Sequence, residues 1–201
     1  MFEKMNFSIE NGYFIDVKGQ KFKTIQTELI DDLSCLSKQL ASEQEYLETQ
    51  FNEKINEEVL YLMRDFQSFI AKNLIQSKIN KGIILDVGCG SYIKVPPYLR
   101  DLVSNNRYIY IGLDPLKITQ LTRDYLFING KFENLHKYIN QKFDILVFST
   151  SLDHFEDLKA VENEIKLVTH KDSIVFFWVG LHDPCIVWEH SMTAFIRRNS
   201  W

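Results

Sequence analysis

The stretch ILDVGCGSYIKVPP, residues 84–97, carries most of the information about the fold. An apolar run ends in Asp86, and two glycines, Gly88 and Gly90, follow with one residue between them. Glycines at such a turn let the backbone bend tightly and let a ligand approach without meeting a Cβ atom. A dinucleotide-binding turn would carry a third glycine, and Ile93 stands at that position. The stretch therefore predicts a strand that ends in a ligand-binding loop.

Short apolar runs of the same kind recur along the chain after residue 81. They are β-branched or aromatic and apolar in the middle, which is typical of strands buried on both faces of a parallel sheet. The runs are GIILDVG, YIYIGLD, YLFING, FDILVFST and SIVFFWVG. Amphipathic segments separate them, namely YLRDLVSNN, PLKITQLTRD, FENLHKYINQ and HFEDLKAVENEIKLVTH. This alternation predicts an α/β fold with a doubly wound, mainly parallel sheet and right-handed crossovers.

The first 80 residues follow a different pattern, which predicts a hairpin and then a helical segment. FSIENGYFIDV holds two β-prone runs around Asn11-Gly12, a pair typical of a type I′ turn. From Thr24 onward apolar residues recur at spacings of three and four, which predicts helix. A second apolar stripe of this spacing runs from Leu47 to Leu74. We expect the stripe to pack inward; a lid over a substrate pocket and a surface for self-association are the alternatives.

Composition and charge limit the class of protein. The chain has 201 residues, 45% of them hydrophobic, and a net charge of −4, so a soluble globular protein without a broad nucleic-acid surface is expected. Cys35, Cys89 and Cys185 form no pair or cluster with metal spacing, so neither a metal site nor a disulfide framework is expected. The N-terminus lacks the apolar region of a signal peptide, and no apolar run approaches the ~20 residues that span a bilayer. These features predict a cytoplasmic protein that does not enter a membrane.

The residues that follow the strands are the ones to examine, because ligands of open α/β sheets bind beyond the carboxyl ends of the strands. Asp114 ends the second run, where its carboxylate could accept two hydrogen bonds from ribose hydroxyls. It could also cap a helix that has Pro115 in its first turn. A nicotinamide dinucleotide would bring a pyrophosphate close to the negative charge of Asp86. S-adenosylmethionine has no phosphate but carries a sulfonium and an ammonium, which Asp86 suits better.

The segment from about residue 82 to residue 180 resembles the class I S-adenosylmethionine-dependent methyltransferase domain. ILDVGCG is similar to the first motif of that family and YIGLDP to the second. INGKFENL is similar to the third-strand motif, and FDILVFSTSLDHFED resembles the fourth-strand stretch of small-molecule methyltransferases. The resemblance implies a Rossmann-like cofactor-binding domain over residues 81–201. Residues 1–80 would then be an appended hairpin and helical segment for a lid, substrate binding or oligomerisation.

The resemblance also implies the reaction and the residues that bind the cofactor. The reaction would be methyl transfer to a hydroxyl or amine of a small molecule, such as a sugar, a nucleotide-linked sugar or a natural product; protein substrates stay open. The cofactor-binding residues would be Asp86, Gly88, Cys89 and Gly90 for the methionine part, Asp114 for the ribose, Pro115, Leu116, Phe132 and Glu133 for the adenine, and Ser149. Lys131 stands where the family usually has an acid, so a backbone contact from Phe132 would have to serve the adenine amino group. Glu133 could also be a first-turn helix acid.

Candidate catalytic groups follow the fourth and fifth strands. His154 titrates near neutral pH when unperturbed, which suits a general base for a hydroxyl or amine acceptor, and Asp153 precedes it. Alternatively, Asp153 caps the following helix and His154 packs in its first turn. Ser149, Ser151, His182 and Asp183 are the other polar candidates at this edge.

The segment after the fifth strand is shorter than the helix and hairpin that members of the family carry there. We therefore expect a second copy of the chain, another partner, or the N-terminal segment to cover the edge of the fifth strand. This short segment, together with Lys131 and Ile93, leaves a second hypothesis open: a catalytically degenerate methyltransferase fold that acts as a binding or regulatory subunit. A nicotinamide-dependent oxidoreductase is the third hypothesis.

Overall fold

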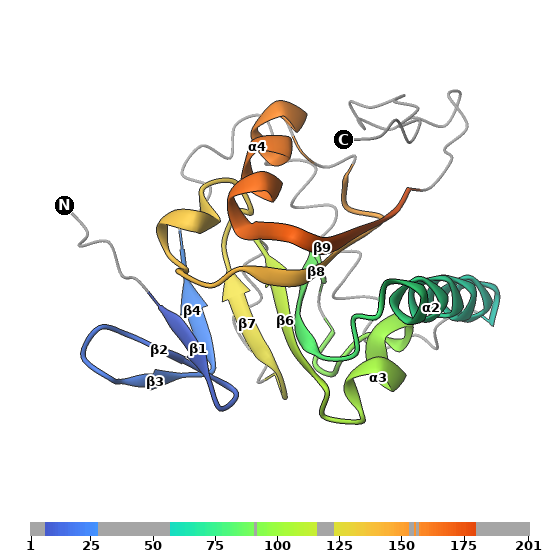
Figure 1. The fold of residues 1–201 in the computed structure, drawn as a ribbon, viewed down its shortest axis with the longest axis horizontal. Helices are drawn as coiled ribbons and strands as arrows, with labels where there is room; N and C mark the ends of the chain where they lie inside the picture. The colour runs from blue at the N-terminus through green and yellow to red at the C-terminus, as the bar shows by residue number, and fades with distance from the viewer. Residues whose placement is uncertain are drawn as a thin grey trace.

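A sheet of six parallel strands forms the centre of the molecule (Figure 1). The computed structural model describes residues 7–27, 57–90, 92–115, 123–152, 155 and 157–179. The strands lie in the order β4-β7-β6-β5-β8-β9, and every neighbouring pair is parallel. Their bounds are β4 Thr24–Gln26, β5 Gly82–Val87, β6 Tyr108–Asp114, β7 Leu126–Asn129, β8 Phe143–Ser149 and β9 Thr169–Trp178. The prediction of a parallel α/β sheet is confirmed, and the five apolar runs form five of its six strands, with β4 as the sixth.

A small antiparallel sheet precedes the large one. It contains β1 Ser8–Glu10, β2 Tyr13–Ile15 and β3 Lys21–Phe22. Asn11 and Gly12 have φ angles of 51° and 74°, as a type I′ turn requires, so the predicted hairpin is confirmed. The hairpin docks through Phe7, whose N–H donates to the carbonyl of Tyr138 at 2.8 Å.

The prediction of helix from Thr24 onward is wrong for Thr24–Gln26, which form β4 and pair with β7. Ile25 is buried in the core, as its apolar character predicts, but it lies in a strand and not on the face of a helix. The later part of the predicted helix, residues 28–56, lies outside the described residues. Because β4 joins the large sheet, the predicted division near residue 80 does not separate two sheets.

The N-terminal strand covers the edge of β7, opposite the edge for which a cover was expected. The hairpin docks beside Ile139, which forms a parallel bridge with Phe7. Within the described ranges β9 is therefore an edge strand of the large sheet.

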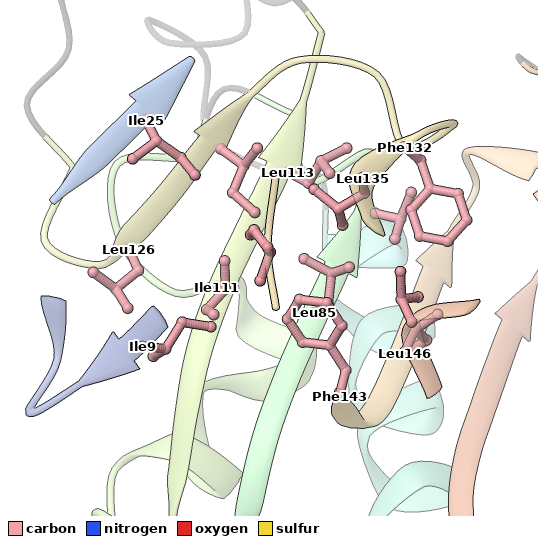
Figure 2. Packing of buried hydrophobic residues seen from close by; sticks show 14 of the residues in the cluster. Ile9, Ile25, Leu85, Ile111, Leu113, Leu126, Phe132, Leu135, Phe143 and Leu146 are labelled. Atoms are coloured by element: carbon pink, nitrogen blue, oxygen red, sulfur yellow. The ribbon is translucent and has the colours of Figure 1, made fainter. Parts of the chain in front are cut away.

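The helices cover both faces of the sheet. On one face lie α2, Glu57–Ser77, and α3, Pro97–Val103, side by side (Figure 1). Met63, Phe66, Ile70 and Leu74 of α2 are buried against this face, so the prediction that the stripe packs inward is confirmed there. The other face carries the hairpin, the 3₁₀ turn η1, Leu135–Lys137, and α4, Leu158–Val168. Figure 2 shows its core, with Leu85, Ile111 and Leu146 of the sheet close to Phe132 and Leu135.

One predicted helix differs from the structure, and a second cannot be compared with it. FENLHKYINQ was expected to be a helix, but only η1 forms there, because Asn134 is left-handed (φ 71°) and Glu164 of α4 accepts from the N–H groups of Asn134 and His136. The segment PLKITQLTRD falls largely on residues 116–122, outside the described residues. No helix of the described ranges is long and apolar enough to cross a membrane.

Candidate functional site

The glycine turn after β5 folds across the end of β6. The N–H groups of Gly88 and Cys89 donate to the carbonyl oxygen of Leu113 at 2.8 and 3.1 Å. Gly88 and Gly90 have φ angles of 74° and 66°, a region that L-residues with a Cβ atom rarely adopt. A Cβ on Gly88 would also lie 2.3 Å from the Cβ of Ser151. Both glycines that the sequence singled out are therefore required by the backbone.

Asp114 lies directly against this turn. It ends β6, is 4% exposed, and its Oδ2 accepts the N–H of Gly90 at 2.7 Å. Its carbonyl oxygen accepts from Asn129 Nδ2 at 2.9 Å and from the N–H of Gly130 at 3.1 Å. The acid predicted for ribose binding and the glycine loop thus form one connected unit at the carboxyl ends of β5 and β6.

Asp86 is buried completely between two tyrosines. Its Oδ2 accepts hydrogen bonds from the hydroxyls of Tyr98 and Tyr110, each at 2.8 Å, whereas its Oδ1 is buried without a hydrogen-bond partner. Burial raises the pKa of Asp86 to about 7, although the two tyrosine hydroxyls act to lower it; the charge of Asp114 raises it further. This carboxyl group therefore changes its charge near neutral pH.

Sequence reasoning did not connect these two tyrosines with Asp86. A signal was present, because Tyr110 lies in a strand that is otherwise apolar, and a buried tyrosine hydroxyl needs a polar partner. Tyr98 comes from α3, so only the packing of that helix on the sheet brings it to Asp86.

The residues after β8 support the glycine turn. The Ser151 hydroxyl donates to the carbonyl of Val87 at 2.6 Å, and both Ser149 and Ser151 are buried. Thr150 has a φ of 54°, which is strained for a β-branched residue, and its N–H donates to the carbonyl of Trp178 at 2.7 Å. Ser151 was expected among the catalytic candidates, but its hydroxyl is committed to holding β5 and β8 together.

The residues just before β7 hold the loop that follows the turn. Nη2 of Arg123 donates to the carbonyl of Gly90 at 3.1 Å, and its Nε donates to the Tyr125 hydroxyl at 3.0 Å. The Tyr125 hydroxyl in turn donates to the carbonyl of Tyr92. The N–H of Asp124 donates to the carbonyl of Ile93 at 3.0 Å. None of these contacts could be read from the sequence.

The residues predicted near the adenine lie in two settings. Pro115 and Glu133 are half-buried, whereas the Phe132 side chain is 1% exposed and packs edge-on against Phe148 at 5.4 Å between ring centroids. Because this ring belongs to the core, only the backbone of Phe132 is available to a ligand. Lys131, the residue before Phe132, is half-buried.

Several predicted groups cannot be placed. Leu116, Asp153, His154, His182 and Asp183 lie outside the described residues. Asp157, rather than Asp153, caps α4 by accepting from the N–H groups of Lys159 and Ala160. Cys89 is a free, buried thiol, and burial raises its pKa well above the ordinary value. Among the described residues no cluster of metal-ligating side chains occurs.

Residues 85–177 match a family model described as a methyltransferase domain. None of the curated proteins matches the chain significantly.

Among the solved structures that are similar to the chain are two plantazolicin methyltransferases. One is the plantazolicin methyltransferase BpumL in complex with a pentazolic desmethylPZN analog and SAH, with 15% identity, a TM-score of 0.49, and coverage of 71% of this chain and 56% of that one. The other is the plantazolicin methyltransferase BamL in complex with a triazolic desmethylPZN analog and SAH, with 18% identity, a TM-score of 0.41, and coverage of 72% and 59%. The match thus spans less than two thirds of either of these structures.

Proposed function

We propose that this chain, whose residues 85–177 match a family model described as a methyltransferase domain, is a class I S-adenosylmethionine-dependent methyltransferase that binds S-adenosylmethionine and transfers the methyl group to a small molecule. The proposed acceptor atom is a hydroxyl oxygen or an amine nitrogen. The observation that carries the proposal is the buried carboxyl group of Asp86, which has one oxygen without a hydrogen-bond partner. Asp86 lies near the end of β5, just before the glycine turn that contacts Asp114.

The residues present suit this cofactor. A buried polar atom without a partner costs free energy, so Asp86 Oδ1 is a place where a donor from a ligand would be favourable. An ammonium group there would also favour the ionised carboxylate and lower the pKa of Asp86. Asp114 has a carboxylate at the carboxyl end of β6, where ribose hydroxyls can be bound.

The same geometry disfavours a dinucleotide. A pyrophosphate is bound by the N–H groups of a helix that begins at the glycine turn. The helix described after this turn, α3, begins only at Pro97 and lies against α2. Asp86 adds an acidic group next to the turn, so the nicotinamide hypothesis has little support.

When bound, S-adenosylmethionine supplies a methyl carbon activated by its sulfonium. The chain must orient the acceptor, exclude water and accept a proton from it. His154 remains our proposed base and Asp153 its proposed neighbour. A role for α2 as one wall of the acceptor site is supported by Trp178 at the end of β9, whose ring lies 5.1 Å from that of Phe66.

Titration calorimetry with S-adenosylmethionine, its demethylated product and NADH tests the proposal. We expect micromolar binding of the first two and none of NADH. Asp114→Asn and Asp86→Asn should each weaken binding about tenfold or more, because each removes a charge from a hydrogen bond to the ligand. The exposed Asp172→Asn is the matched control and should bind like the wild type.

If the wild-type chain binds neither S-adenosylmethionine nor its demethylated product, the proposal is overturned. That result would favour the hypothesis of a catalytically degenerate fold that acts as a binding subunit. If binding is found, a screen of small hydroxyl and amine compounds with a methyl-labelled donor identifies the acceptor class. A cytoplasmic location and a partner or second copy on the β9 edge stay proposals, which fractionation and light scattering of the purified protein would test.

A further inference from the structure

Three consecutive residues just before β7 hold the loop after the glycine turn. Arg123, Asp124 and Tyr125 donate to the carbonyl oxygens of Gly90, Ile93 and Tyr92, respectively. Carbonyl groups of a surface loop are ordinarily hydrated, so three side-by-side bonds to one short segment are a built feature. The loop is thereby tied down across the face of the sheet that also carries α2 and α3.

Arg123 is the central member of this attachment. Its guanidinium carbon lies 3.6 Å from the centroid of the Phe127 ring, and two of its nitrogens donate, one to Gly90 and one to Tyr125. Stacking on an aromatic ring and a planar set of donors are properties that arginine has and lysine lacks. The side chain is half-buried, so water competes weakly for these bonds.

Gly90 is consequently held from both sides. The peptide unit before it donates its N–H to Asp114 Oδ2 at 2.7 Å, and the peptide unit after it accepts from Arg123 at 3.1 Å. Fixing both peptide units determines the φ of 66° at Gly90 and the position of the loop relative to Asp114. In a dinucleotide-binding turn, a helix that begins at the turn and a third glycine would do this.

We propose that Arg123 is a positioning residue for the cofactor: by holding the Gly90 carbonyl, it keeps the glycine turn and the Asp114 carboxylate in the arrangement that binds the nucleoside. This inference rests on the proposed function. Arg123 acts through Gly90 and Tyr125 and does not itself bind the ligand. It explains how the turn stays ordered although Ile93 replaces a third glycine.

The test measures two quantities for each variant of the full chain: the affinity for S-adenosylhomocysteine, by calorimetry, and the rate of amide hydrogen exchange at Gly90. Arg123→Ala should weaken binding about tenfold and speed exchange of the Gly90 N–H, because one side of the Gly90 attachment is lost. Arg123→Lys should restore part of the affinity, since lysine can reach Gly90 but cannot donate to Tyr125 at the same time. Arg107→Ala, at an exposed position before β6, is the control and should change neither quantity.

Tyr125→Phe gives a second, milder variant that keeps the ring and removes only the hydroxyl that links Arg123 to Tyr92. It should weaken binding in the same direction, even where Arg123→Ala fails to fold. Unchanged affinity and unchanged Gly90 exchange in a folded Arg123→Ala would overturn the inference. Failure of the wild type to bind the ligand would overturn the proposed function instead, and the exchange measurement would still decide whether Arg123 holds the turn.

Discussion

The hydroxyl of Ser151 donates a 2.6 Å hydrogen bond to the carbonyl oxygen of Val87, and this bond joins the carboxyl end of β8 to that of β5. The Cβ of Ser151 fills the space that Gly88 leaves free. The segment expected to face the methyl acceptor and the loop expected to face the cofactor therefore support each other directly. A substitution in the segment after β8 should therefore alter the glycine turn after β5, and the reverse should hold as well.

Gly88→Ala should destabilise the protein more than a glycine substitution elsewhere. Gly19 has a similar φ of 79° but has no atom within 4 Å of an added Cβ, so Gly19→Ala isolates the cost of the backbone, about 1 kcal/mol. Gly88→Ala adds an overlap with Ser151 and should cost about 2 kcal/mol more. Urea unfolding of both variants measures the difference, and equal free energies of unfolding would contradict the overlap.

Asp86 should make the protein less stable as the pH rises from about 4 to about 7. Its folded pKa of about 7 is above the ordinary value of 3.8, so in this range the folded protein keeps a proton that the unfolded chain has lost. The free energy of unfolding should fall by up to about 4 kcal/mol across the range and level off above it. Asp86→Asn, which does not titrate, should lack this decline and be more stable than the wild type at pH 8. An equal difference between the two proteins at pH 5 and pH 8, in urea unfolding, would contradict the prediction.

Tyr110→Phe and Tyr98→Phe should destabilise the protein more at pH 8 than at pH 5. Each removes a 2.8 Å hydrogen bond to Asp86, which carries a full charge only above its folded pKa of about 7. Loss of a bond to the charged form should cost about 2 kcal/mol, and loss of the bond to the neutral form about 1 kcal/mol. Tyr108→Phe is the control, because its hydroxyl donates to the carbonyl of Ile79 and not to Asp86. Its effect should be independent of pH over this range.

Glu164→Ala should release the segment that carries η1. Glu164 is 3% exposed and accepts the N–H groups of Asn134 and His136 at 3.2 and 2.6 Å, together with a contact to His136 Nδ1 at 2.7 Å. Removing this acceptor leaves backbone donors without partners and should cost about 3 kcal/mol. Exchange of the Asn134 and His136 amides should speed up as well. Asn163→Ala, exposed on the same helix, should change stability by less than about 0.5 kcal/mol.

Several features of this protein could be predicted from the sequence, and they share a local cause. A run such as YIYIGLD is apolar on both sides of a strand, and only a sheet covered on both faces can bury it. Gly88 and Gly90 follow an apolar run that ends in an acid, and the backbone angles observed there need glycine. Asn11-Gly12 makes its own turn for the same reason. Each of these inferences depends on residues close together along the chain.

The contacts at the candidate site were decided only by the tertiary structure. Asp86 looked like a ligand-facing acid, but its complete burial in the folded protein raises its pKa to about 7, against the lowering effect of the hydrogen bonds from Tyr98 and Tyr110, 12 and 24 residues away. No sequence pattern singled out Arg123, yet it holds Gly90, 33 residues earlier in the chain. Thr24–Gln26 became a strand because the edge of β7 was available to pair with it. The local sequence pattern determined which segments are strands and where the glycine turn lies. Burial and hydrogen bonds between distant segments determined the pKa of Asp86 and the shape of the loop after Gly90, because both depend on neighbours that no local pattern contains.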